Sequence, residues 1–310
     1  MFKTITQYAS KNIPFLFFTD FKGEKINVYK LDELEKNDIE FSIKKPKKDH
    51  SYIKLTTNPI SFEKYKIKFD NFISEIKKGN TYLGNLTQAT PIECELNLQE
   101  IFDIANADYK LHVKNKFVCF SPEPFITIEN NTIKTYPMKG TIDTSIANAK
   151  ATILANKKEM AEHIMIVDLL RNDLSIVATD VKVDKFRFTQ VIKAGEKELL
   201  HVSSEISGKL EKNWKKSLGN TIKELLPAGS ISGTPKKSTV KILETIEGYE
   251  REYFSGVFGV FDGEKLQTSV MIRFIENMNG KLIYKSGGGI TLDSDAKSEY
   301  QELLDKIYIP

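Results

Sequence analysis

Residues 157–173 carry the pattern that most constrains how this chain can fold. Apolar side chains recur along the segment at helical spacing, which predicts one buried stripe on an α-helix. Glu159, Glu162 and His163 group on another side of the same helix. Two carboxylates one turn apart repel each other unless water screens them or a cation lies between them. The segment therefore predicts a helix whose glutamates are either solvated or engaged with a cation.

A capping role offers a structural explanation for Glu159. Asn156 could cap the N-terminus of the helix, and Glu159 would then complete a capping box. However, a second helix predicted over residues 294–308 repeats the spacing with Glu299 and Glu302, opposite its apolar side chains. Two such helices facing each other could hold one hard divalent cation.

Composition and charge narrow the class of protein. The chain has 310 residues, of which 40% are hydrophobic and 28% charged, enough to bury a core as one large domain or two closely packed ones. A net charge of +3 on 45 basic and 42 acidic residues gives no field suited to nucleic acid, whereas small anions remain possible. No apolar run approaches the roughly 20 residues that span a bilayer, so we expect no membrane insertion.

Cysteine usage favours a reducing compartment. Cys94 and Cys119 are the only cysteines, and they form neither a CxxC pair nor a zinc-binding spacing. The N-terminus also lacks the apolar core of a signal peptide. The expected location is the cytosol.

Helical and strand patterns follow one another in irregular order, which predicts an α+β fold. Helices are predicted over residues 62–78, 215–226 and 236–247. The lysine-rich run at 44–48 is expected to be a surface loop. Strands are predicted over residues 13–18, 25–29, 82–87, 116–120, 125–129, 132–136, 181–188, 255–262 and 265–275, with Asn130-Asn131 as a hairpin turn.

Three further stretches need an explanation. Residues 227–235 offer small side chains, hydroxyls and backbone N–H groups before a helix, which suits an anion unless the loop is a plain connector. Glycines 287–289 at a strand end indicate close approach of a ligand or a neighbouring strand. Lys139 is the only charged residue in the stretch Pro-Met-Lys-Gly-Thr, residues 137–141.

Taken in series, these motifs resemble the chorismate-utilising enzymes, and most closely component I of aminodeoxychorismate synthase. The resemblance runs from about residue 62 to the end and is most specific over residues 161–174, 227–236 and 287–295. It implies two large, mostly antiparallel β-sheets packed as a sandwich with helices outside. It also implies a shortened β-rich N-terminal segment, residues 1–60, packed with a chorismate-binding catalytic domain, residues 61–310, as one globule.

The resemblance implies a magnesium site. Glu162 and Glu302 match the Mg²⁺ ligands, and Glu159 and Glu299 match supporting carboxylates. Because Mg²⁺ prefers oxygen ligands and keeps several waters, it would bridge protein carboxylates to a carboxylate of the substrate.

Substrate contacts are implied for residues on several segments. An arginine suits a carboxylate because its planar fork meets both oxygens. For Lys306 the alternative is a surface ion pair with Glu302, four residues earlier. The matched positions are Gly140, Thr141, Arg273, Gly289 and Lys306.

The resemblance also implies covalent catalysis by Lys139, whose amine would add to C2 of chorismate as the C4 hydroxyl leaves. Glu123 matches the general acid for that hydroxyl, and His201 matches a histidine near the reacting ring, with a structural role as its alternative. The chain departs from the family pattern elsewhere, but the departures spare the metal ligands, the lysine and the acid. They are Leu83, Pro124, Phe254, Phe274 and Gly288.

The expected activity is the conversion of chorismate to 4-amino-4-deoxychorismate for para-aminobenzoate and folate biosynthesis. Because the chain shows no amidotransferase signature with a nucleophilic cysteine, a separate glutamine amidotransferase subunit would supply the ammonia. Anthranilate synthase and isochorismate or salicylate synthase are the enzymatic alternatives. A chorismate-binding regulatory protein without activity is the alternative from another class.

Overall fold

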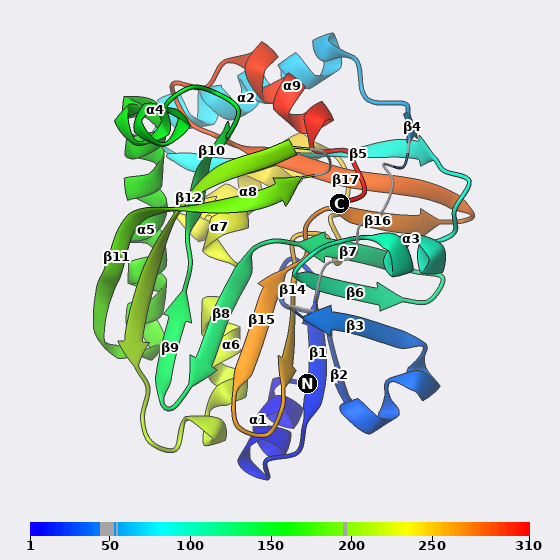
Figure 1. Cartoon of the computed structure of the whole chain (residues 1–310), viewed down its shortest axis with the longest axis vertical. Helices are drawn as coiled ribbons and strands as arrows, with labels where there is room; N and C mark the ends of the chain where they lie inside the picture. The colour runs from blue at the N-terminus through cyan, green and yellow to red at the C-terminus, as the bar shows by residue number, and fades with distance from the viewer. Residues whose placement is uncertain (44–52, 54, 195–196) are drawn as a thin grey trace. The chain divides into compact units, whose positions relative to one another are not determined.

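Each of the two large sheets gathers strands from distant parts of the sequence. The computed structural model describes residues 1–43, 53, 55–194 and 197–310 (Figure 1). The lysine-rich run at 44–48 lies outside the described residues. The described chain divides into two units: unit 1 comprises Met1–Leu31, Glu123–Ser230 and Val257–Ser269, and unit 2 comprises Asp32–Pro122, Ile231–Gly256 and Val270–Pro310.

Unit 1 is built on a sheet with the strand order β10-β12-β9-β8-β15-β14-β1-β2, to which β11 adds by pairing with β12. Its strands are β1 (Phe15–Thr19), β2 (Ile26–Lys30), β8 (Pro124–Glu129), β9 (Thr132–Thr135), β10 (Met138–Asp143), β11 (Thr179–Ala194), β12 (Lys197–Lys209), β14 (Val257–Phe261) and β15 (Leu266–Val270). Its helices are α1 (Phe2–Ser10), α4 (Ala149–Ala155), α5 (Lys157–Val177) and α6 (Leu218–Leu225). In Figure 1, α5 runs along the end of the sheet formed by β10, β11 and β12.

Local chemistry explains two features of unit 1. Asn130 and Asn131 both have positive φ, 48° and 60°, as the tight hairpin between β8 and β9 requires. At the start of α5, the Asn156 side chain accepts a hydrogen bond from the Glu159 N–H at 3.1 Å, so the predicted N-cap is confirmed. The helix extends to Val177, and its buried stripe carries Glu162 and His163 together with Ile166 and other apolar residues. The predicted separation of these two polar residues from the buried stripe is therefore wrong, because α5 buries them together with its apolar face.

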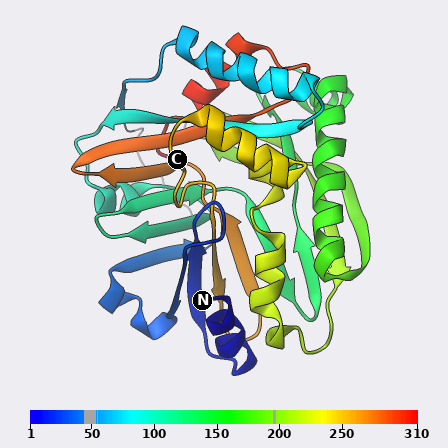
Figure 2. The same cartoon turned by 180° about the vertical axis from the view of Figure 1, so that it is seen from behind.

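Unit 2 is built on a sheet with the order β13-β5-β17-β16-β7-β6-β3, and β4 pairs with β5. Its strands are β3 (Ile39–Ile43), β4 (Thr56–Thr57), β5 (Leu83–Glu93), β6 (Tyr109–Val113), β7 (Phe117–Ser121), β13 (Gly233–Thr234), β16 (Phe274–Met278) and β17 (Lys281–Ile290). Its helices are α2 (Phe62–Lys77), α3 (Leu98–Ile104), α8 (Lys236–Glu247) and α9 (Ala296–Asp305); α7 (Gly229–Ser232) joins the units. Figure 2 shows α2 beside α8 and α9, where Phe72, Leu243 and Leu303 share an apolar core with the β5–β17 pair.

The α+β class and the two large antiparallel sheets are confirmed. The single strand predicted over residues 265–275 is wrong: β15 belongs to the sheet of unit 1 and β16 to that of unit 2. Between them Arg273 has φ +48°, a left-handed conformation outside the extended region that strands adopt. The β-pattern continues through the break without glycine or proline, so the sequence carries no sign of it. Among the described helices, none has the length and apolar character needed to cross a bilayer.

The two cysteines should differ sharply in reactivity. Cys119 lies on β7 with no exposed surface, and burial raises the pKa of its thiol, whereas Cys94 is partly exposed. Because the thiolate is the reactive form, iodoacetamide should modify Cys94 alone in the native protein and both cysteines in urea. Peptide mass spectrometry measures this directly, and rapid native labelling of Cys119 would contradict the burial of β7.

Candidate functional site

Lys139, Glu159 and Glu162 lie together in unit 1. The Nζ of Lys139 on β10 is 2.7 Å from Oε2 of the buried Glu162 on α5, and Lys158 lies 3.9 Å from the other carboxylate oxygen. Gly140 has φ +94°, and a Cβ there would lie 3.2 Å from Oε2 of Glu159. A glycine in this bulge of β10 therefore lets the strand pass close to the first carboxylate while the neighbouring lysine binds the second.

Behind this group lies a buried polar chain that the sequence reasoning did not identify. His163 Nε2 is 2.7 Å from the Ser204 hydroxyl, which accepts a hydrogen bond from the Arg187 backbone N–H at 2.9 Å. The Arg187 guanidinium donates to two carbonyls at the end of α4. Burial lowers the pKa of His163 to about 4, and the charges of Arg187 and Lys139 act in the same direction, so its imidazole is neutral near pH 7. The signal in the sequence was its position next to Glu162.

Thr141 and His201 are direct neighbours across the sheet. Thr141 on β10 lies opposite His201 on β12, which in turn lies opposite Gln190 on β11. Residues directly opposite each other share one face of a sheet, so these side chains form one row. Glu123 immediately precedes β8, partly buried, and its carbonyl accepts a hydrogen bond from Ser269 at 2.7 Å.

In unit 2, α9 brings its two glutamates against the glycines of β17. A Cβ on Gly288 would lie 3.3 Å from Oε2 of Glu299 and 3.6 Å from Oε1 of Glu302. Glu299 is buried, and Glu302 is half-exposed. Lys306 Nζ lies 2.7 Å from Glu302 Oε1 and 2.8 Å from the Gly287 carbonyl oxygen. The alternative ion pair proposed for Lys306 is therefore present, and the same ammonium also binds the glycine strand.

The glycines at 287–289 are approached closely by two parts of unit 2, strand β5 and the carboxylates of α9. Gly287 pairs with Thr87 on β5, and a Cβ on Gly287 would lie 2.6 Å from the Leu86 carbonyl oxygen, so here the neighbouring strand demands glycine. At Gly288 the carboxylates of α9 come close instead. Gly289 pairs with Asn85, one step further along β5.

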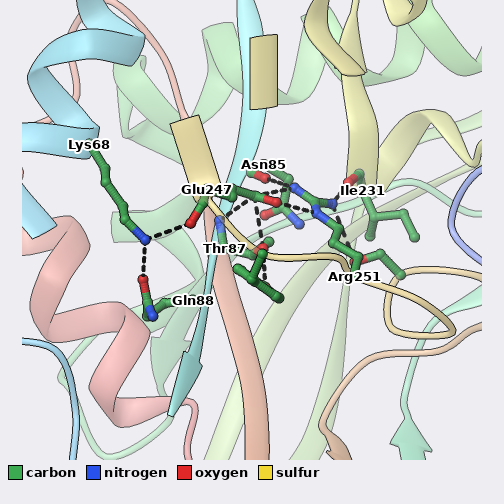
Figure 3. Close-up of polar contacts among 9 residues, drawn as sticks. Lys68, Asn85, Thr87, Gln88, Ile231, Glu247 and Arg251 are labelled. Carbon is green, nitrogen blue, oxygen red and sulfur yellow. Dashed lines mark hydrogen bonds and ion pairs between the residues drawn. The ribbon is translucent and has the colours of Figure 1, made fainter. Parts of the chain in front are cut away.

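A buried ion pair fixes β5 opposite these glycines. Arg251 and Glu247 are 3% and 2% exposed, and two N–H groups of the guanidinium donate to the two carboxylate oxygens (Figure 3). Glu247 Oε1 accepts hydrogen bonds from the N–H and the hydroxyl of Thr87, each at 2.8 Å, while Arg251 donates to the Asn85 carbonyl. Lys68 donates to the Glu247 carbonyl at 2.7 Å. Both charges are buried away from water, so removing either residue would leave the other charged and unpaired in the interior.

Arg273 lies on the link between β15 and β16. Its guanidinium carbon is 4.9 Å from the centre of the Tyr308 ring. This tyrosine falls at the end of the helix predicted over residues 294–308, whereas α9 ends at Asp305 and leaves Tyr308 outside the helix.

The two groups of glutamates share one arrangement. In each, an ExxE helix offers one glutamate to a lysine and sets a carboxylate against a strand glycine. Carboxylate oxygens are the ligands that hard cations such as Mg²⁺ prefer, so these residues fit the expected ion. Among the described residues, no three His, Cys, Asp or Glu side chains gather into a metal cage. The facing of the two helices stays a prediction.

Comparison with known proteins adds independent findings. A family model described as chorismate binding enzyme matches residues 8–310. A Haemophilus influenzae protein named "uncharacterized PabA-like protein" is 45% identical over 309 residues, 98% of this chain and 94% of its own length. Aminodeoxychorismate synthase component 1 of Salmonella typhimurium is 33% identical over 260 residues, 78% of this chain and 56% of its own length. Anthranilate synthase component I of Streptococcus pneumoniae has a similar fold, with a TM-score of 0.71 at 24% identity over 84% of this chain and 60% of its own.

Removing one partner of the buried pair should be costly. We expect Glu247→Ala to lower the free energy of unfolding by about 3–5 kcal/mol, because Arg251 is left charged and unpaired in the interior. The matched control is Asp70→Ala, which breaks an exposed pair with Lys66 and should cost less than about 1 kcal/mol. Urea unfolding compares the two variants, and equal costs would show that the network does not stabilise the unit.

Proposed function

Because the chain belongs to the chorismate-binding enzymes, we propose that it converts chorismate and ammonia to 4-amino-4-deoxychorismate, as component I of an aminodeoxychorismate synthase. The observation that supports this proposal best is the ion pair of Lys139 with Glu162, at 2.7 Å beside Gly140. It joins the lysine expected in an aminase to the carboxylate expected to bind magnesium.

In the proposed reaction, the Lys139 amine adds to C2 of chorismate, the ring double bonds shift, and the C4 hydroxyl leaves with a proton from Glu123 as water. Ammonia then adds at C4, the double bonds shift back, and the Lys139 amine leaves from C2. Addition requires the unprotonated amine, so Lys139, whose Nζ lies beside Glu162, must attack in its neutral form. His163 behind it is neutral and adds no charge to the group.

Glu162 and Glu302 would hold the magnesium ion, with Glu159 and Glu299 supporting them. When bound, the ion supplies positive charge that orients a substrate carboxylate. Lys139 and Lys306 balance the charge of the two ligand glutamates in this structure. Thr141, Arg273 and Gly289 would contact the substrate, and His201 would lie near the reacting ring.

The ammonia would come from a glutamine amidotransferase subunit. Neither cysteine of this chain lies in an amidotransferase signature, which supports a separate subunit as the source of ammonia. The low cysteine content supports a reaction in the cytosol.

Product identification tests the proposed reaction. The purified chain, given chorismate, Mg²⁺ and ammonium, should form 4-amino-4-deoxychorismate, identified by mass spectrometry and NMR. With glutamine in place of ammonium, it should form no product unless an amidotransferase subunit is added. Fluorescent anthranilate or isochorismate as the product would overturn the aminase assignment, and glutamine-dependent turnover by the chain alone would overturn the need for a partner.

Replacing the nucleophile tests the covalent step. Lys139→Ala should lower kcat by about 1000-fold or more, because no other amine takes its place. Lys158→Ala is the matched control, since this exposed lysine approaches the same carboxylate only to 3.9 Å, and it should retain most activity. Circular dichroism checks the fold of both variants. A wild-type rate for Lys139→Ala would discard the covalent step.

A further inference from the structure

We propose that Tyr308 is a positioning residue: its ring holds Arg273 by the flat face and leaves the edge of the guanidinium to a carboxylate of the substrate. The inference rests on the proposed function, in which Arg273 recognises a carboxylate of chorismate. It adds a residue that neither the motifs nor the family pattern assigned.

In the proposed arrangement the ring contacts the face of the guanidinium, the part of arginine that a carboxylate does not need. The guanidinium carbon of Arg273 is 4.9 Å from the Tyr308 ring centre, within the range of a cation–π contact. The N–H donors of a guanidinium lie in its plane, so a ring against its face leaves them available. Among the described residues, the Arg273 side chain has no hydrogen bond or ion pair with the protein. The N–H donors of Arg273 therefore remain available for a ligand.

The backbone around Tyr308 is tied down on both sides. The Tyr284 hydroxyl donates to the Tyr308 carbonyl at 3.0 Å, and the Pro310 carbonyl accepts a hydrogen bond from the Asn106 N–H. Ile309, between them, is 6% exposed and packs in an apolar core of unit 2. Because the chain is held at three successive positions, the backbone that carries the Tyr308 ring cannot move away from Arg273 without breaking these contacts.

Arg273 itself is held in an unusual backbone conformation. Its φ of +48° is one that residues other than glycine, asparagine and aspartate rarely adopt. Phe274, the next residue, pairs at once with Lys285 and Cys119 in the middle of the sheet, so the chain cannot relax by shifting along the strand. Strained residues persist where the surroundings over-determine them, commonly at ligand clamps. The conformation is thus a second sign, independent of the ring contact, that Arg273 is built for a ligand.

The test compares chorismate binding and turnover across a small set of variants in the full chain, with Mg²⁺ and ammonium. Tyr308→Leu keeps apolar bulk and removes the aromatic face, and Tyr308→Phe restores the face without the hydroxyl. Arg273→Ala and the double variant form a cycle with them. Tyr82→Ala, which truncates an exposed tyrosine of the same unit, is the control for general effects.

Loss of a partly exposed cation–π contact predicts that Tyr308→Leu raises the KM for chorismate about 3- to 30-fold. Its kcat should stay within about twofold, since the reacting atoms are untouched. Tyr308→Phe should recover most of the lost affinity. In the Arg273→Ala background, Tyr308→Leu should have no further effect, because the group that it positions is gone.

The outcomes separate this inference from the proposed function. If Arg273→Ala weakens chorismate binding while Tyr308→Leu leaves KM unchanged, the positioning role is overturned. If Tyr308→Leu lowers kcat and melting temperature and adds fully to Arg273→Ala, its role is structural and the inference is again overturned. If Arg273→Ala itself leaves KM unchanged, the carboxylate recognition assumed in the proposed function fails.

Discussion

Close packing of carboxylates against glycine backbone is the constraint on which both groups of glutamates depend. At Gly140 and at Gly288, a side chain would meet a glutamate oxygen at 3.2–3.3 Å, closer than Cβ atoms normally allow. The absence of a side chain lets an ExxE helix lie directly against a strand in each unit. The glutamates are thereby held in place by the fold, and a lysine on the same strand or helix balances one charge of each pair. The repulsion between the two carboxylates of each helix, expected from the sequence, is reduced by these nearby lysines.

Support for these groups comes from buried polar contacts deeper in each unit. In unit 2, Glu247 and Arg251 clamp β5, the strand that pairs with the glycines of β17. In unit 1, His163 and Ser204 form a chain behind Glu162 that keeps a neutral imidazole in the interior. Both networks bury polar groups, which is costly, and their hydrogen bonds add rigidity to the neighbouring glutamates and glycines.

The amphipathic helices were predictable because each buries a continuous stripe that local periodicity records. The ranges 62–78, 157–173 and 236–247 correspond to α2, α5 and α8 within a few residues. The residues grouped around Glu162 were predictable in part, since Lys139 and Gly140 are adjacent and the glutamates share a helix face. Ser204, Arg187 and Tyr308 were not, because each reaches its partner through strand pairing or a backbone turn that leaves no periodic signal.

The sequence by itself determined the α+β class, the two ExxE helices and the position of the lone Lys139, because spacing, caps and turn residues act over a few neighbours. Only the tertiary structure decided that β15 and β16 belong to different sheets. It also decided that Lys139 pairs with Glu162 and that Lys306 binds the glycine strand. Those outcomes depend on which segments meet across a sheet. Such meetings are set by the packing free energy of a whole unit, which no short stretch of sequence contains.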